Sequence, residues 1–261
     1  SITQMRPYAD KLNSILVHLL SNIEGDLISV YGTERQNRSA AIVIITSSRG
    51  LCGAFNSNII KAAMHLINNE LREIREAGNL SLICIGKRGL DFMRRRYSDC
   101  TIIDDYVDMF SDLSFDNVNI ASNMIITSFE QKKFDVVYVT YGQFKNAATQ
   151  VTSTERFLPV PKTFEEEGIR KKKTKADYIF SPDKNELLED LVPMILQTHF
   201  HKYLLDTHAS EHGARMTAMD KATENANELL NELKINYNKA RQEAITKELS
   251  EIVGGAAALN G

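Results

Sequence analysis

This 261-residue sequence is poor in cysteine and has no long apolar runs. Its three cysteines, Cys52, Cys84 and Cys100, are an odd number without paired metal-ligand spacing. No disulfide framework is therefore implied, and a reducing, cytoplasmic compartment is favoured. Because there is neither a run of about 18 apolar residues nor a charged-then-apolar leader, we expect no transmembrane segment and no export signal. Any association with a membrane would have to come through partners.

The sequence also lacks an excess of one charge. It has 31 lysines and arginines against 34 aspartates and glutamates, which gives a formal net charge of −3. Nucleic-acid-binding proteins usually carry a basic excess, so we expect no nucleic-acid partner. A composition of 43% hydrophobic and 25% charged residues is ordinary for a globular protein with a sizeable core.

The middle of the chain alternates between short apolar runs and amphipathic stretches of helix length. The runs are rich in β-branched residues and too short for helices, as buried strands are; they cover residues 41–46, 80–85 and 134–140. Helical spacing occurs at residues 57–77, 87–96 and 116–131. This alternation predicts an α/β body with a largely parallel sheet and flanking helices. Residues 148–157 alternate apolar with polar side chains, which favours an antiparallel or edge strand.

Both ends of the chain are predicted to be helical. Apolar residues at steps of three and four predict a helix over residues 4–28, and nearly everything from Asp183 to about Val253 is compatible with helix. The stretch from Met194 to Val253 corresponds to roughly 90 Å of helix. A body of about 140 residues, whose radius of gyration should be about 14 Å, is much narrower. Much of this helix should therefore project from the body and find another partner.

The last helix carries an apolar seam of nearly 3.5-residue period, as a left-handed coiled coil requires. Its members are Ala222, Ala226, Leu229, Leu233, Tyr237, Ala240 and Ala244. The N-terminal helix is the obvious partner within the chain. We therefore expect residues 1–30 and 183–261 to form a discontinuous shaft, an antiparallel coiled coil. Residues 31–182 form the inserted α/β body in this prediction.

A basic loop is predicted at residues 159–177, which contain two prolines, an acidic run and then a basic run. Residues 170–175 (RKKKTK) place five cations in six positions. Like charges repel, so a solvated loop is favoured. The alternative is attraction to anionic lipid headgroups, worth about 1 kcal/mol for each cation near the surface.

Two motifs raise the alternative of an enzyme. His208, Glu211 and His212 form the pattern H-x-x-E-H of inverted zinc peptidases, and His201 lies seven residues upstream. Such a short pattern arises easily by chance, and no distal glutamate ligand can be singled out. We therefore expect no metal and no cofactor, and keep a metal-dependent enzyme as the alternative.

The second motif is the loop Arg49–Asn56, whose glycines follow a predicted strand and could free backbone amides for a phosphate. It lacks both G-x-G-x-x-G and a G-K-[ST] ending, as does the turn at residues 86–89. A tight structural turn is favoured. Nothing local pairs Cys52 with a base, so we predict no catalytic residue.

Three segments carry a resemblance to a known family. Residues 209–259 closely resemble the C-terminal helix of F-type ATP synthase gamma subunits. The loop at residues 46–56 (TSSRGLCGAFN) is similar to the family's glycine-containing loop after its first body strand, and Arg6-Pro7-Tyr8 is similar to the end of its first long helix. The chain is identified as a bacterial member. The family's first helix usually begins several turns earlier with a basic stretch that is absent here, so we expect the first part of that helix to be lacking.

The resemblance implies a noncatalytic rotor, the central shaft that transmits rotation between the proton-driven membrane ring and the catalytic ring. The implied partners are the alpha and beta subunits, the epsilon subunit and the membrane c-ring, with the chain peripheral on the cytoplasmic face of the bacterial plasma membrane. A passive coiled-coil tether fits the periodicity almost as well. The particular polar residues of the 209–259 segment favour the rotor, because a tether needs only the seam.

The resemblance also implies contact residues. Arg215, Gln242 and Thr246 match family positions that contact loops of the catalytic subunits, and Gln242 and Thr246 lie one helical turn apart. Tyr178 and Phe180 match aromatic positions of the segment that touches the membrane ring and epsilon. Without the resemblance, all of these would be taken for ordinary exposed residues.

Overall fold

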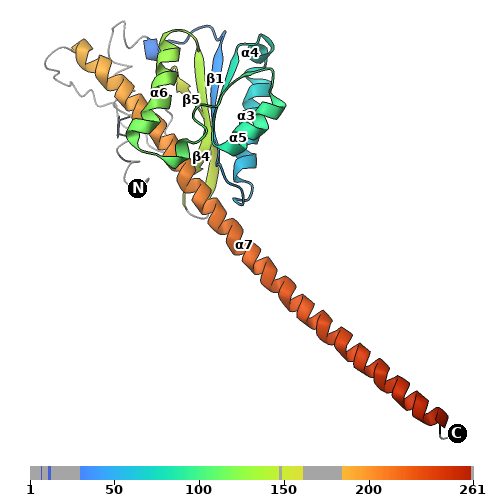
Figure 1. The fold of residues 1–261 in the computed structure, drawn as a ribbon. Helices are drawn as coiled ribbons and strands as arrows, with labels where there is room; N and C mark the ends of the chain where they lie inside the picture. Colours follow the sequence, from blue (N-terminus) through green and yellow to red (C-terminus); the bar gives the residue numbers. More distant parts are fainter. Residues whose placement is uncertain (1–6, 8–10, 13–29, 147–148, 161–183, 260–261) are drawn as a thin grey trace, which may run out of the picture. The chain divides into compact units, whose positions relative to one another are not determined.

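The computed structural model describes residues 7, 11–12, 30–146, 149–160 and 184–259 (Figure 1). The chain divides into two compact units, residues 1–215 and residues 216–261. Most of the predicted N-terminal helix and almost all of the predicted basic loop lie outside the described residues. The antiparallel coiled coil, and the domain division built on it, therefore remain predictions.

The first unit is built on a five-stranded sheet of order β3-β2-β1-β4-β5. Its strands are β1 (Ala40–Ile45), β2 (Leu80–Ile85), β3 (Thr101–Ile103), β4 (Val136–Phe144) and β5 (Gln150–Leu158). Neighbouring strands are parallel except β4 and β5, which are antiparallel. The predicted, largely parallel sheet is confirmed, and the strand predicted to be antiparallel or at the edge is β5, which is both. The prediction missed β3, whose three residues are exposed or half-buried and so show no buried-strand pattern.

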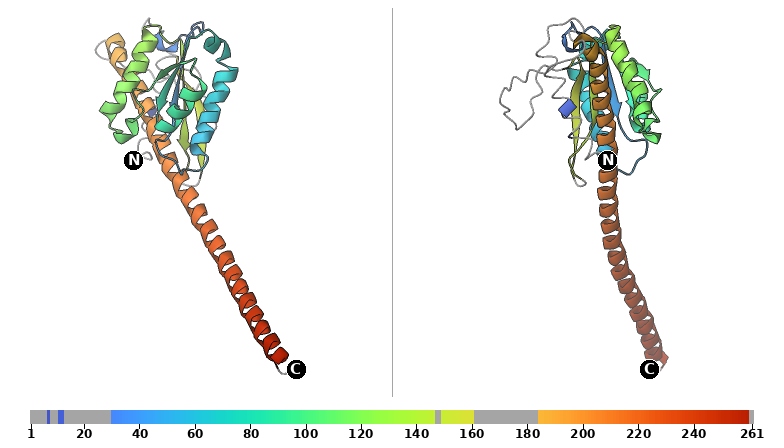
Figure 2. Two further views of the ribbon diagram at one scale, coloured as in Figure 1. Left: turned by 45° about the vertical axis from the view of Figure 1, so that its right-hand side comes forward. Right: turned by 90° about the vertical axis from the view of Figure 1, so that its left-hand side faces the viewer.

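Helices cover both faces of the sheet (Figure 2). They are α3 (Phe55–Asn69), α4 (Arg72–Glu76), α5 (Lys87–Arg96), α6 (Phe115–Glu130) and α7 (Lys184–Leu259), with a 3-10 turn η1 (Met109–Ser111). Strand side chains alternate between two cores, as a period of two requires. Ala41, Val43 and Ile45 pack with α6 and the first part of α7. Ala40, Ile42 and Ile44 pack with α3 and α5.

The prediction of one continuous helix over residues 57–77 is wrong. The structure has two helices there, α3 and α4, and the chain turns at Leu71, whose amide bonds back to the Leu66 carbonyl. The Leu71 side chain is 2% exposed. The turn therefore places an apolar residue in the core, which helical spacing alone does not reveal.

Helix α7 is 76 residues long and continues through Pro193 (Figure 1). The predicted helix from Asp183 to about Val253 is thereby confirmed, with an end six residues further on. Its stretch within the first unit buries Leu196, Phe200 and Leu204 against the sheet and α6. No helix in the described part of the chain is long and apolar enough to cross a membrane.

Candidate functional site

Helix α7 packs at the carboxyl end of the parallel strands, where open α/β sheets usually bind ligands. The ligand crevice of such sheets lies where the strand order reverses, here between β1 and β4. At this place Gly142 of β4 donates its N–H to Thr207 Oγ1 at 3.3 Å. Its carbonyl accepts a hydrogen bond from Ser210 Oγ at 3.1 Å. Side chains of α7 thus contact the backbone that a ligand would otherwise approach.

The close approach of both α3 and α7 to β4 requires a glycine. A Cβ added to Gly142 would lie 2.5 Å from the Phe55 ring and 3.3 Å from Ser210 Cβ. The first distance is far below van der Waals contact, so any side chain would force the helix, the strand or α3 to shift. Gly142 therefore fixes how closely α3 and α7 lie against β4.

A carboxylate on β5 joins the sheet to α7 one turn earlier. Glu155 accepts hydrogen bonds from Tyr141 Oη on β4 at 2.5 Å and from Tyr203 Oη on α7 at 3.0 Å. The two rings are tilted against one another with centroids 4.6 Å apart, and each residue is only 1% exposed. Burial, followed by the neighbouring Glu155 charge, raises the pKa of both phenols. Both tyrosines therefore stay neutral hydrogen-bond donors.

The loop Arg49–Asn56 is closed by its own side chains. Ser47 N–H donates to Asn56 Oδ1 at 2.9 Å, and Asn56 Nδ2 contacts Cys52 Sγ at 3.2 Å. Phe55 N–H donates to the Cys52 carbonyl. These amides serve the turn itself, which favours the predicted structural role over a phosphate cradle.

The H-x-x-E-H pattern does not assemble a metal centre. His208 and His212 lie with their Nε2 atoms 3.2 Å apart, but Glu211 is ion-paired with Arg215 at 2.6 Å. His201 Nε2 instead contacts the Leu113 carbonyl at 2.8 Å. Within the described ranges, no group of three or more His, Cys, Asp or Glu side chains could hold a metal ion. The arrangement gives no support to a metal-dependent enzyme.

The structure separates the predicted contact residues. Arg215 ends the first unit, where its Nη2 donates to Glu211 and, at 3.3 Å, to the Gly50 carbonyl, with 25% of its side chain exposed. Gln242 and Thr246 lie on exposed helix in the second unit. Tyr178 and Phe180 lie outside the described residues. Contacts of these residues with other subunits remain predictions.

We call residues 216–257 of α7 the outer segment. From Met219 to Ala257 every residue is exposed to solvent in this chain. Large apolar side chains are among them, with exposed fractions between 39% and 69%; they are Met219, Leu229, Leu230, Leu233, Ile235, Tyr237, Ile245, Leu249, Ile252 and Val253. An apolar surface this extended marks an interaction site.

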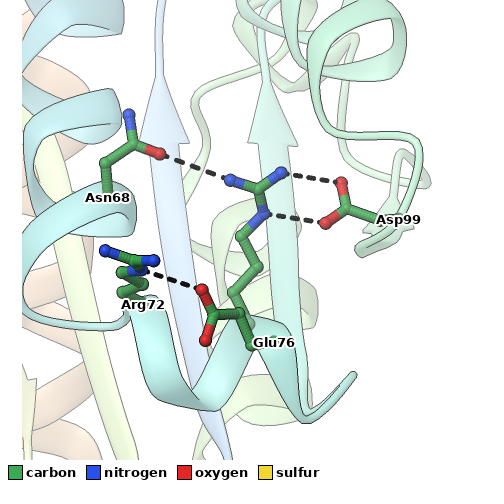
Figure 3. Close-up of a pocket in the computed structure, with 5 residues that line it drawn as sticks. Asn68, Arg72, Glu76 and Asp99 are labelled. Atoms are coloured by element: carbon green, nitrogen blue, oxygen red, sulfur yellow. Dashed lines mark hydrogen bonds and ion pairs between the residues drawn. The ribbon is translucent and has the colours of Figure 1, made fainter.

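In a polar cleft beside α3 and α4, the charged side chains pair with one another (Figure 3). It is lined by Asn68, Arg72, Arg75, Glu76 and Asp99. Arg75 forms a two-pronged bond with Asp99 at 2.8 and 3.2 Å, and Arg72 pairs with Glu76 at 2.8 Å. The hydrogen bond from Arg75 lowers the pKa of Asp99. Since its cations already face carboxylates, the cleft is no anion site.

Sequence reasoning missed the residues that join α7 to the sheet, which are Tyr141, Gly142, Glu155, Tyr203, Thr207 and Ser210. Two signals were present. A glycine inside a strand marks a close backbone approach. Hydroxyl residues at steps of three and four from Phe200, on one helical stripe, mark polar contacts within a packed face. Neither signal names the partner, because the partners are 48 to 68 residues away in sequence.

Comparison with known proteins agrees with the resemblance. A family model described as ATP synthase matches residues 1–259. The ATP synthase gamma chain of Cytophaga hutchinsonii is 47% identical over 98% of this chain and 86% of its own length. That of Flavobacterium johnsoniae is 44% identical over 100% of this chain and 87% of its own length.

Solved structures with low sequence identity share the fold. A chain of the Euglena gracilis mitochondrial ATP synthase has a TM-score of 0.58 at 22% identity and covers 99% of this chain and 92% of its own length. A chain of the Tetrahymena thermophila central stalk and c-ring has a TM-score of 0.53 at 21% identity, over 85% of this chain and 99% of its own length. Together with the identity to curated relatives, these findings show that the chain belongs to the ATP synthase gamma-chain family.

Proposed function

We propose that this chain is the central rotor shaft of an F-type ATP synthase and transmits rotation between the proton-driven membrane ring and the catalytic ring. The observation that carries the proposal, beside family membership, is the outer segment. A helix that leaves residues such as Leu233 and Tyr237 55% and 69% exposed has an apolar surface suited to surrounding subunits.

The two units contact different partners in this proposal. The outer segment lies within the ring of alpha and beta subunits, and the α/β body meets the epsilon subunit and the membrane c-ring. The chain is noncatalytic, and ATP chemistry takes place on its partners. It is a peripheral subunit on the cytoplasmic face of the bacterial plasma membrane, attached through those partners.

A rotor can drive the catalytic ring only if its contacts differ with angle, because a partner that binds all states equally shifts none of them. Gln242 and Thr246 are exposed and one turn apart, so both can meet a single loop of a catalytic subunit. Arg215 presents a planar cation held by Glu211, which suits an acidic partner and would not be replaced equivalently by lysine. These three residues are the proposed angle-dependent contacts.

Assembly tests the proposal directly. The chain is produced together with the alpha, beta and epsilon subunits of its synthase, and the complex is isolated and assayed for ATP hydrolysis. We expect a stoichiometric complex that hydrolyses ATP, whereas the chain alone neither hydrolyses ATP nor binds it tightly. A chain that stays alone under these conditions would exclude the rotor.

A pair of variants tests the outer segment itself. Leu233→Asp places a charge on the apolar surface and should abolish assembly while leaving the isolated chain folded. Asn231→Asp adds the same side chain at an exposed polar position and should assemble normally. If both variants assemble equally well, the apolar surface is not the contact.

A further inference from the structure

The residues that join α7 to the sheet form a set that we call the inner joint. On the side of the body it contains Gly50 of the loop after β1, Gly142 and Glu155, and on α7 it contains Tyr203, Thr207, Ser210 and Arg215. All of them belong to the first unit. The hydrogen-bonded helix continues from this joint into the outer segment without a break.

The helical members of the joint lie along one side of α7. Tyr203, Thr207 and Ser210 are spaced by four and three residues, which places them on a single stripe. From Tyr203 to Arg215 the joint extends over about 18 Å of helix. The helix is thus held at several successive levels rather than at one point.

The chemistry of the joint differs from the apolar packing beside it. Burial of Leu196, Phe200 and Leu204 stabilises the packed helix, but the hydrophobic effect has no preferred direction. A hydrogen bond weakens steeply when its angle falls below about 120°. Bonds from the helix to Glu155 and to the backbone of Gly142 therefore resist turning of the helix about its own axis.

Hydrogen bonds from two adjacent turns of the helix reinforce this resistance. The Gly142 backbone accepts from Ser210 Oγ and donates to Thr207 Oγ1, so two adjacent turns of the helix bond to one strand residue. Thr207 Oγ1 also donates to the Tyr203 carbonyl at 2.8 Å, which orients its lone pair toward β4. Rotation of α7 would break these bonds together.

We propose that the inner joint is the place where torque passes between the α/β body and α7, with Tyr203, Thr207 and Ser210 as positioning residues. This inference rests on the proposed rotor function. If the body is attached to the membrane ring and the outer segment to the catalytic ring, rotation must cross from sheet to helix. The joint supplies direction-dependent hydrogen bonds between the sheet and α7.

The test uses the assembled synthase in inverted membrane vesicles, where ATP hydrolysis and ATP-driven proton pumping are measured on one preparation. The joint variant Tyr203→Phe/Thr207→Val/Ser210→Ala removes three hydroxyl groups and keeps the rings and side-chain volumes nearly unchanged. We expect hydrolysis to continue and the number of protons pumped for each ATP to fall at least twofold. A merely structural role would lower the amount of complex without changing this ratio.

Matched controls separate the joint from a general loss of hydroxyl groups. Tyr138→Phe/Ser122→Ala removes a phenol on the other face of β4 and a buried hydroxyl that bonds within α6. Thr207→Ser alone keeps the hydroxyl of the joint. Both controls should keep the wild-type ratio.

Two outcomes would overturn the inference. Either the joint variant pumps as many protons for each ATP as the controls do, or it assembles poorly but shows an unchanged ratio in the complexes that form. If no complex forms with the joint variant, Tyr203→Phe alone is measured and must lower the ratio. An unaltered chain that forms no synthase would instead refute the rotor function itself.

Discussion

Helix α7 uses one apolar spacing for two purposes on either side of Arg215. In the first unit, Leu196, Phe200 and Leu204 recur every four residues and are at most 1% exposed. In the outer segment, Leu229, Leu233 and Tyr237 recur with the same spacing and are 55% to 69% exposed. The pattern therefore establishes an apolar stripe, while burial depends on whether this chain or another subunit supplies the partner.

The largest expected contrast comes from one substitution made in both stretches. Leu204→Ala should lower the free energy of unfolding of the isolated chain by about 2–5 kcal/mol, because it leaves a cavity in the core. Leu233→Ala, at an exposed position, should change it by less than about 0.5 kcal/mol. Chemical denaturation of the two variants measures both values. Equal effects would mean that the outer segment packs on residues of its own chain.

The packing of α3 and α7 on β4 can be disturbed with a single methyl group. Gly142→Ala should destabilise the isolated chain by about 1–3 kcal/mol, since the added Cβ overlaps the Phe55 ring. Gly254→Ala lies in the outer segment with nothing within 4 Å of the added Cβ, and should not destabilise. Thermal unfolding followed by circular dichroism compares the two. A neutral Gly142→Ala would show that the contact relaxes at no cost.

Acid should weaken the inner part of α7 and not the outer segment, which contains no histidine. Burial lowers the pKa of His201, and burial followed by the neighbouring His212 lowers that of His208. Their folded-state pKa values lie below the ordinary 6.5, so the unfolded chain binds protons first as pH falls. Their contribution to stability is present above about pH 6.5 and is lost below it.

The measurement is the unfolding midpoint at pH 7.5 and 5.5. We expect a lower midpoint at pH 5.5, and a smaller difference in His201→Gln/His208→Gln. His208 also faces Phe110, Glu211 and Arg215, and His201 faces Phe115 and the Leu113 carbonyl. His65→Gln, an exposed site on α3, serves as the control and should keep the wild-type difference. An unchanged difference in the double variant would remove these histidines as the cause.

The smallest expected effect on stability accompanies a loss of function. Gln242→Ala/Thr246→Ala should leave the unfolding free energy of the isolated chain within about 0.5 kcal/mol of wild type, because both residues are exposed. Assembly or coupled turnover of the complex should weaken. If the double variant assembles and turns over normally, these positions are not contacts, and torque passes through packing of the shaft alone.

Several elements could be predicted closely because their signal is local. Helix α5 begins and ends at the predicted residues 87 and 96, and β2 covers the predicted residues 80–85. Strand β3 and the turn at Leu71 could not, because a short half-buried strand and a buried turn residue depend on contacts with the rest of the body. The predicted contact residues came from family resemblance. The structure shows that Arg215 bonds Glu211 and the Gly50 carbonyl, and that Gln242 and Thr246 are exposed.

The sequence by itself determined the alternation of strands and helices in the body, the length of the last helix and the apolar stripe of that helix. These features follow from periods of two and of about 3.6 residues along the chain. Only the tertiary structure decided which part of that stripe is core. It also decided that Glu155 bonds Tyr141 and Tyr203, and that Gly142 receives α7. Such contacts join residues distant in sequence, and a hydrogen bond or a steric contact depends on positions in space that no local period specifies.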